Sequence, residues 1–318
     1  MTTGLDTEAA PSRAADTDSS EPVPLLFVGG TGRSGTHVVS KILNSSGHFR
    51  KVPNEARFHV DPGGFPDVLA GRTGPDLFAY RLEHYWYRNF EPSRLSFRGI
   101  HRYVPKRRLH SAQTSFLRRF DDEPEAACRQ LFFDLLWPLA TERAKAGLIE
   151  QSCDTVAEAG PLSRLFPEAR FVHVVRDGRD VAASRVGQAR WLAYPRTMQQ
   201  GLEWWEARIR RIDDGVRAAG SDRVLAVSLD DLVSGNRRKN TLKRMRGFAG
   251  LGNDKRMRAY FERRVKVRNA HAERWREEVP EGRQAEVDAQ YVQILDRLEA
   301  DGIHCARMLR RVHGRRDS

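Results

Sequence analysis

The chain has 318 residues, 40% of them hydrophobic, and a formal net charge of +12 at pH 7. This size can bury a substantial core, and the basic charge favours anionic partners such as nucleotides, nucleic acid or acidic substrates. The apolar runs are too short to cross a bilayer, and three widely separated cysteines argue against a disulfide framework and against a cysteine-rich zinc site. We therefore expect a cytoplasmic protein that has no membrane partner and holds its cysteines as buried free thiols.

The first 23 residues are rich in Ala, Thr, Ser, Asp, Glu and Pro, and no basic segment followed by an apolar stretch occurs among them. Such a composition is typical of a disordered leader and not of a signal peptide. We expect this leader to cover residues 1–23 and a single domain to cover residues 24–318.

Short apolar runs alternate with helical patterns after the leader. The run PLLFVGG, residues 24–30, ends in glycines and predicts a buried strand, and apolar residues at helical spacing from Val38 to Leu43 predict the helix that follows. Further strands are expected near residues 48–52, 147–152, 171–175 and 223–232. This alternation predicts an α/β fold of the P-loop-like, three-layer kind, with helices on both sides of a central parallel sheet and ligands at the carboxyl ends of its strands.

The pattern is interrupted between about residues 60 and 125. Glycines and prolines in DPGGFPDVLAGRTGPD precede an aromatic cluster, YRLEHYWYRNF, and a basic stretch, HRYVPKRRLH. We expect an irregular insertion that covers the mouth of the sheet as a lid. Its aromatic side chains have two open interpretations, packing in a core or contact with an acceptor molecule. From residue 199 onward, amphipathic patterns predict helices in which most arginines face solvent.

A glycine-rich turn, GGTGRSGTH, joins the first strand to the first helix. Gly30 and Gly35 have the interval of a nucleotide-phosphate loop, but Thr36 occupies the position at which nucleoside triphosphatases have their lysine. The backbone N–H groups of such a turn and the positive end of the helix bind one anionic group. Ser34 and Thr36 would add hydroxyl donors. The nearest cation is Arg33, which suits a short anhydride better than a triphosphate.

A second anion site is predicted after the strand that ends at Arg176. Ser184 lies eight residues further on, inside the next helix. The strands of a parallel sheet have their carboxyl ends at one edge, so this site should lie beside the glycine-rich turn. An ion-pair network is the open alternative for the arginine and aspartate cluster VRDGRD. Two adjacent anion sites indicate a ligand that is phosphorylated at two places.

Both motifs resemble those of a known enzyme family. The segments FVGGTGRSGTH and FVHVVRDGRDVAAS are similar to the two cofactor motifs of sulfotransferases that use 3′-phosphoadenosine 5′-phosphosulfate, with the eight-residue interval from Arg176 to Ser184 intact. The resemblance runs from residue 24 to about residue 280. Within the family, the chain is most similar to the tyrosylprotein sulfotransferase branch, through FVGG..RSGT, through LSRLFPEARF before VRDGR, and through the basic-Trp pair in ERW.

The resemblance implies a site for the nucleotide donor. The residues that would hold its 5′-phosphosulfate are Arg33, Ser34, Gly35, Thr36 and His37. Those that would hold its 3′-phosphate are Arg176 and Ser184, and Arg274 matches a further basic contact. Arg33 and the amides of the turn would neutralise the departing oxygen during in-line transfer. The sulfuryl group carries one negative charge less than a phosphoryl group, so we expect no metal ion.

The resemblance also implies an acceptor site. We expect Glu55, in PNEARF, to act as the general base for an acceptor hydroxyl, because the catalytic glutamate of the tyrosylprotein branch is likewise followed two residues later by an arginine, here Arg57. Arg57 and His59 are expected to contact the acceptor. The alternative bases are the histidines His37, His59, His84 and His101.

Two positions depart from the family pattern. Gln151, in IEQSCD, occupies a position where the family often has a lysine that stabilises the transition state, and a glutamine carries no charge. Gln188 replaces an arginine that contacts the donor in the tyrosylprotein branch. We therefore expect either compensation by other arginines, slow turnover, or an acceptor that is sulfated readily.

The function predicted from these observations is sulfuryl transfer to the hydroxyl of a small molecule or a glycan, with phenols and sugars as candidates. A P-loop kinase-like phosphotransferase is one alternative, which the threonine at position 36 argues against. The other is a non-catalytic protein that binds a nucleotide or nucleic acid. The basic residues are scattered through mixed-charge segments without a zinc-finger, homeodomain or RNP-type pattern, so no nucleic-acid partner is expected.

Overall fold

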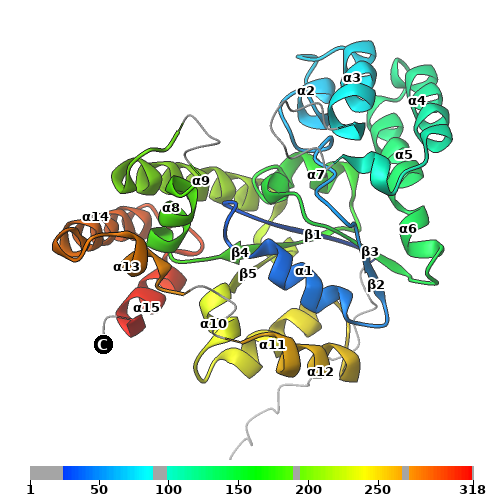
Figure 1. Cartoon of the computed structure of the whole chain (residues 1–318). Helices are drawn as coiled ribbons and strands as arrows, with labels where there is room; N and C mark the ends of the chain where they lie inside the picture. The colour runs from blue at the N-terminus through cyan, green and yellow to red at the C-terminus, as the bar shows by residue number, and fades with distance from the viewer. Residues whose placement is uncertain (1–23, 89–98, 189–193, 267–271, 317–318) are drawn as a thin grey trace, which may run out of the picture.

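The computed structural model describes residues 24–88, 99–188, 194–266 and 272–316, and the expected leader over residues 1–23 lies outside these ranges. A parallel five-stranded sheet forms the centre (Figure 1). Its strands are β1 (Leu25–Gly30), β2 (Phe49–Lys51), β3 (Gly147–Glu150), β4 (Arg170–Val175) and β5 (Val224–Ser228). Their order is β2-β3-β1-β4-β5, and every pairing is parallel. All five strands that the sequence predicts are therefore confirmed.

The order of the strands determines where a ligand can bind. From β1 the chain passes to β2 and β3 on one side of the sheet, and then to β4 and β5 on the other. A sheet of this topology binds ligands outside the carboxyl ends of the strands at which the winding direction changes, here β1 and β4. Gly30, the last residue of β1, is in register with Val174 near the end of β4. The two predicted anion sites therefore start from the same edge of the sheet.

The central strand is buried on both faces. Phe27 packs into one hydrophobic core and Leu26 and Val28 into another on the opposite side of the sheet. Every residue of β1 is buried, so the strand is a continuous apolar run and does not alternate between polar and apolar residues.

Helices form the outer layers (Figure 1) and confirm the three-layer α/β prediction. One layer contains α1 (Thr36–Asn44), α10 (Leu229–Val233), α11 (Arg238–Phe248) and α12 (Lys255–Arg264). The opposite face is covered by α7 (Ala159–Leu165) and α9 (Met198–Ala219). Beyond β4, a third hydrophobic cluster joins α9 to α8 (Gly178–Val186), α13 (Arg274–Glu278), α14 (Glu281–Ala300) and α15 (Ala306–Arg316). Two short 3-10 turns are η3 (Cys153–Thr155) and η4 (Ser221–Arg223).

The segment from 60 to 125 is helical where it is described, which corrects the expectation of an irregular insertion. It contains α2 (Phe65–Leu69), α3 (Pro75–Arg81), the π-helix η1 (Leu82–Tyr87), the 3-10 turn η2 (Ile100–Arg102), α4 (Lys106–Phe120) and the start of α5 (Pro124–Leu136), after which α6 (Pro138–Thr141) follows. The glycines and prolines that indicated breaks in fact begin helices, with Pro66 and Pro75 in the first turns. Proline is favoured there because the first N–H groups of a helix have no partner within the helix.

The aromatic cluster of this segment divides between the two interpretations left open above. Trp86 and Tyr87 are buried in the core, and Trp86 packs on Phe78 with 5.8 Å between ring centroids. Tyr80, in contrast, is 62% exposed. Tyr85 and Trp86 belong to the π-helix, a distortion that occurs often at functional sites, and both line the cleft described below.

The described ranges contain no helix that has both the length and the apolar character of a membrane span. All three cysteines are free thiols, as expected. Cys128 and Cys305 are buried, whereas Cys153 is partly exposed.

Candidate active site

The turn after β1 has the backbone of an anion-binding nest. Gly32, Arg33 and Gly35 have left-handed φ values of 78°, 59° and 94°, a conformation that brings successive N–H groups to one concave surface. Gly35 precedes α1 and has no side chain with which to cap its N–H groups, so these groups can bind an external anion. A Cβ atom on Gly35 would lie 2.8 Å from Leu229. Arg33 is not a glycine, and its left-handed backbone costs roughly 1 kcal/mol.

Ser34 does not present its hydroxyl to the cleft, which differs from the expected hydroxyl donor. The side chain is fully buried and packs over Gly30, where an added Cβ would lie 2.4 Å from the Ser34 Oγ. This Oγ has no hydrogen-bond partner among the residues that the structure describes. A role for Ser34 in holding an anion therefore depends on its backbone N–H.

Direct contacts join the two predicted anion sites. The Arg33 Nε donates a hydrogen bond to the Ser184 Oγ at 2.9 Å, and the Arg176 Nη1 donates to the Arg33 carbonyl oxygen at 2.8 Å. The open alternative of an ion-pair network also applies here, because Asp177 and Arg179 form a fully buried pair at 2.8 Å and the Arg176 guanidinium lies 3.8 Å from Asp180. Arg176 itself keeps 8% exposure and lines the cleft.

The cleft above these residues has a volume of about 590 Å³. The glycine-rich turn and Arg176 form part of its wall, and the segment around Glu55 forms another part. Of the residues predicted for the site, those that line the cleft are Arg33, Gly35, Thr36, His37, Glu55, Arg57 and Arg176. The tertiary structure therefore brings the predicted base into the same cavity as the predicted donor site.

A buried glutamate beneath the cleft holds the Glu55 segment in place. The Glu150 carboxylate accepts hydrogen bonds from the Ala56 N–H at 3.0 Å, from the Ser152 N–H at 2.8 Å and from the Ser152 hydroxyl at 2.8 Å. The His59 Nε2 lies 3.0 Å from the same carboxylate. Burial alone would raise the pKa of Glu150, but the charge of His59 and these hydrogen bonds outweigh it and lower the pKa.

Glu55 has a thiol as a neighbour. The Cys153 Sγ donates to the Glu55 Oε1 at 3.4 Å. Burial, with the nearby carboxylate of Glu55, raises the pKa of Cys153, so the thiol stays protonated at neutral pH and remains a hydrogen-bond donor. Both residues line the cleft, and Glu55 faces a space in which a ligand hydroxyl can bind.

The two residues predicted to contact the acceptor differ in position. Arg57 lines the cleft and pairs with Asp61 at 3.0 Å. His59 is fully buried and stacks on Phe27 with 5.6 Å between ring centroids. Because His59 is buried, it is neither an acceptor contact nor an alternative base. The local sequence pattern does not show that His59 packs beside Glu150 inside the core.

Of the other histidines considered as bases, His37 lines the cleft, and His84 and His101 do not. His84 packs on Tyr80 with 4.4 Å between centroids, and the His101 Nδ1 lies 2.8 Å from the Tyr87 carbonyl oxygen. His37 thus remains the one alternative base among these that the described cleft contains.

Arg274, the further donor contact predicted from the resemblance, does not line the cleft. Its guanidinium pairs with Glu278 within α13. The backbone N–H groups on either side, of Glu273 and Trp275, donate to Asp180 of α8 at 3.1 and 3.2 Å. The segment is therefore attached to the helix that carries Ser184, although the Arg274 side chain lies elsewhere.

The two positions that depart from the family pattern, Gln151 and Gln188, differ in whether they line the cleft. Gln151 is fully buried and does not line the cleft; its Oε1 accepts a hydrogen bond from the Ser40 hydroxyl of α1 at 2.6 Å. Gln188 does line the cleft. Gln151 thus connects the end of β3 to α1.

Three residues that sequence reasoning missed also line the cleft: Arg185, Trp204 and Arg208. Arg185 stacks on Trp204 with 4.8 Å from its guanidinium carbon to the ring centroid, and Arg208 pairs with Asp154 at 2.5 Å. The amphipathic pattern predicts that Arg208 is one of the helix arginines that face solvent. The sequence contains one signal for this side of the cleft, the pair Trp204 and Trp205 in α9. Adjacent helical residues point in different directions, and only Trp205 is fully buried, so Trp204 is available to line the cleft.

The C-terminal helix contributes a buried cation beside the second motif. Arg316 is 8% exposed in its side chain and pairs with Asp177 at 3.2 Å, with Asp180 at 3.0 Å and with Asp230 in a shorter contact. Asp180 also lies 3.8 Å from the Arg176 guanidinium. The sequence indicated an ion-pair network at VRDGRD as an alternative, but not the partner Arg316, which lies 140 residues beyond Arg176.

A parallel sheet whose central strand leads into a glycine-rich turn, beside a buried arginine that follows the next strand, defines a P-loop-like α/β protein with a candidate anion site. The chain belongs to the sulfotransferase family, whose model matches residues 24–255. It is therefore a transferase of the sulfotransferase type. The likeness to the tyrosylprotein branch remains a prediction.

Solved structures similar to this chain include three sulfotransferases. The sulfotransferase domain of the Synechococcus PCC 7002 olefin synthase is 17% identical, with a TM-score of 0.49 over 89% of this chain and 97% of that chain. The sulfotransferase domain of the curacin biosynthetic pathway is 14% identical, with a TM-score of 0.47 over 75% and 77%. Sulfotransferase STF1 of Mycobacterium tuberculosis is 14% identical, with a TM-score of 0.44 over 77% and 72%. No curated protein sequence matches the chain.

Proposed function

We propose that this sulfotransferase moves the sulfuryl group of 3′-phosphoadenosine 5′-phosphosulfate to a hydroxyl group of a small molecule or glycan. The observation that carries the proposal is the contact of Arg33 with Ser184 at 2.9 Å. It unites two anion sites at one end of the cleft, as a donor with separate 5′ and 3′ anionic groups requires.

The donor groups are assigned to the two sites by their chemistry. The N–H groups of the nest, together with Arg33, Thr36 and His37, suit the 5′-phosphosulfate, because the N-terminus of a helix favours a phosphate or sulfate group. Arg176 and Ser184 suit the 3′-phosphate, for which a guanidinium fork and a hydroxyl are good donors. The cations Arg185 and Arg208 supply further positive charge in the same cleft.

The transfer step can be written with all atoms balanced. The acceptor oxygen forms a bond to sulfur as the bond from sulfur to the bridging oxygen breaks. The acceptor proton passes to the Glu55 carboxylate, and the bridging oxygen leaves with its electron pair on 3′,5′-bisphosphoadenosine. Arg33 and the amides of the turn stabilise that oxygen, and donors aimed at developing charge typically contribute about 3–4 kcal/mol each. No step of this mechanism uses a metal ion.

The acceptor site is proposed for the part of the cleft beside Glu55. Tyr85, Trp86 and Trp204 line this cavity, and aromatic faces suit a phenol ring or the apolar face of a sugar. Arg57 and Asp61 form a polar pair at 3.0 Å within it. These side chains support an acceptor that has a ring, with polar groups around it.

Calorimetric titration tests the proposed donor against the kinase alternative. The chain should bind 3′,5′-bisphosphoadenosine without metal, and bind adenosine 5′-phosphate more weakly because the second anion site stays unused. Tighter binding of ATP with magnesium than of the bisphosphate would favour a phosphotransferase instead. Salt-sensitive binding of an oligonucleotide, without bisphosphate binding, would favour the nucleic-acid alternative.

Incubation with labelled donor and a panel of hydroxyl acceptors then tests the transfer. A labelled product that forms with a phenol or sugar, and not with the matching deoxy compound, is the expected result. The lack of a product across phenols, sugars and alcohols, in a chain that binds the bisphosphate, would indicate a nucleotide-binding protein without transferase activity.

A further inference from the structure

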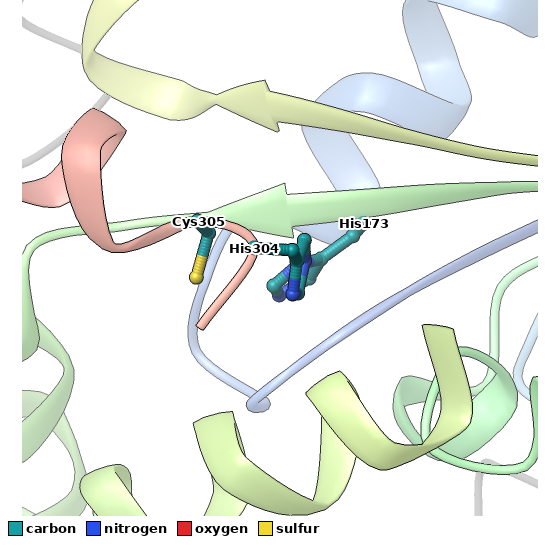
Figure 2. A group of neighbouring side chains, drawn as sticks. All are labelled: His173, His304 and Cys305. Atoms are coloured by element: carbon teal, nitrogen blue, oxygen red, sulfur yellow. The ribbon is translucent and has the colours of Figure 1, made fainter. Parts of the chain in front are cut away.

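Three potential metal ligands meet between the sheet and the C-terminal helices (Figure 2). His173 lies on β4, and His304 and Cys305 are adjacent in the turn between α14 and α15. One ligand atom from each lies within 4.8 Å of the others. Figure 2 shows the two imidazole rings close together, with the Cys305 side chain next to them. None of the three lines the cleft, so this cluster is separate from the proposed transfer site.

A carboxylate orients His304 toward the cluster. Asp213, on α9, accepts hydrogen bonds from the His304 backbone N–H at 2.8 Å and from the His304 Nδ1 at 2.8 Å. This partner assigns the ring proton to Nδ1 and leaves the lone pair of Nε2 directed toward His173, whose Nδ1 lies 2.8 Å away. A carboxylate on the far nitrogen is the usual outer partner of a histidine that binds a metal.

The other two side chains are sequestered from solvent. His173 is fully buried; its Nδ1 faces His304, and its Nε2 has no hydrogen-bond partner within the described ranges. Cys305 is also fully buried. A divalent metal removes the proton of a thiol when it binds, as it does for coordinating thiols in general.

We propose that His173, His304 and Cys305 bind one zinc ion, with Asp213 as the outer carboxylate. Two imidazole nitrogens and one thiolate form a ligand set that zinc prefers over magnesium or calcium. Two nitrogen ligands of a tetrahedral zinc lie about 3.3 Å apart, so the His173 Nδ1 and the His304 Nε2, now 2.8 Å apart, would separate by about 0.5 Å on binding. The His304 side chain is 20% exposed, so an ion can approach it from solvent.

The position of the cluster indicates a structural role. The zinc would connect β4, next to the central strand β1, to the turn that precedes α15. The last turn of α15 contains Arg316, which pairs with Asp177 and Asp180 beside the second anion motif. The ion would therefore attach the start of α15 to the sheet, while the ion pairs of Arg316 attach its end.

Metal analysis of the purified full chain tests the proposal without any measurement of sulfuryl transfer. The chain should retain about one zinc per molecule, and Cys305→Ser and His304→Ala should lose it. Cys128→Ser is the matched control, because Cys128 is equally buried but lies far from these residues in a separate core cluster; it should keep its zinc. The melting temperature should fall on chelation in the wild type and in Cys128→Ser, and not in Cys305→Ser.

Cobalt provides a second measurement in case the variants fold poorly. Wild-type chain that is stripped of metal and titrated with cobalt chloride should develop a thiolate-to-cobalt charge-transfer band in the near ultraviolet, which zinc chloride then abolishes. If this band does not appear and zinc does not change the melting temperature of the metal-free chain, the proposal is wrong. The cluster would then be a hydrogen-bonded chain from Asp213 through His304 to His173. Either result is independent of whether the chain binds the nucleotide donor.

Discussion

The guanidinium of Arg33 and the hydroxyl of Ser184 are hydrogen bonded at 2.9 Å, although 151 residues separate them in the chain. The glycine-rich turn and the second motif are therefore in direct contact. Arg176 strengthens this connection, because it donates to the carbonyl oxygen of Arg33 at 2.8 Å. A change to one motif should alter the ligand contacts of the other.

The two arginines of this site should separate catalysis from donor binding. Arg33→Ala should reduce kcat about 10²–10³-fold, since it removes a donor to the departing oxygen, with a smaller effect on the Kd for 3′,5′-bisphosphoadenosine. Arg176→Ala should weaken that Kd about 10- to 100-fold, the value of a charged hydrogen bond. Calorimetry and initial rates measure both effects. Arg283→Ala is the control, because Arg283 is exposed and pairs only with Glu286 in the described structure; the reverse pattern would exchange the two roles.

Removal of the proposed base should abolish transfer and leave donor binding intact. Glu55→Gln keeps the size of the side chain and its hydrogen bond with Cys153, but it cannot accept the acceptor proton. We expect turnover to fall about 10²–10⁴-fold, with an unchanged Kd for the bisphosphate. Glu286→Gln, at an exposed position, should have no effect on either. Wild-type turnover in Glu55→Gln would exclude Glu55 from the mechanism and leave His37 as the base.

Stability should depend on pH through Glu150. The lowered pKa of this buried carboxyl means that the unfolded chain takes up a proton at a higher pH than the folded chain does. The stabilisation is thus complete above the usual value of 4.5 and is lost as pH falls through the folded pKa. Urea unfolding should show that the free energy of unfolding falls more steeply between about pH 5 and pH 3 in the wild type than in Glu150→Gln. Equal slopes would mean that Glu150 does not titrate in this range.

At neutral pH, Glu150→Gln should itself be destabilised by about 1.5–3 kcal/mol, the usual contribution of hydrogen bonds to a charged group. The same variant should lose turnover, because the Ala56 N–H beside Glu55 loses its charged acceptor. Rates measured well below the melting temperature of the variant separate this positioning effect from unfolding.

The C-terminal arginine should be required to neutralise the acidic cluster. Arg316→Met leaves Asp177, Asp180 and Asp230 without their shared cation, and we expect the free energy of unfolding to fall by about 3–5 kcal/mol. Adding Asp230→Asn to this variant should restore part of the loss, since burial already raises the pKa of Asp230. Denaturant unfolding of the two single variants and the double variant measures the coupling, and strictly additive effects would argue against a shared network.

The family lysine should not be tolerated at position 151. Gln151→Lys places a charge at a fully buried position and replaces the acceptor of the Ser40 hydroxyl with a donor group. Burial of an unpaired ion costs several kcal/mol, so the melting temperature should fall and turnover should not rise. A stable variant with faster turnover would show that position 151 reaches the transferred group. Gln188→Arg, inside the cleft, is the comparison variant, and its fold should be unaffected.

Local sequence was sufficient to predict the sheet and the centres of both anion motifs. Buried parallel strands such as Leu25–Gly30 are continuous apolar runs, and the turn that follows needs glycine at its left-handed positions. The glycine and proline patterns between 60 and 125 were misleading. Proline can interrupt a helix, but it is also favoured in the first turn of one, and Pro66 and Pro75 lie in such first turns.

The sequence by itself determined the parallel α/β architecture and the positions of the two strand–turn–helix motifs proposed to bind anions, because these depend on short-range patterns of apolar residues and glycine. Only the tertiary structure decided which side chains share an environment. In the folded chain, His59 lies against Glu150 and outside the cleft, whereas Arg208 lines the cleft. His173 contacts His304, although 131 residues separate them in the sequence. The direction of a side chain and the identity of its distant partners follow from the packing of helices on the sheet, and this packing depends on contacts that no local window of sequence contains.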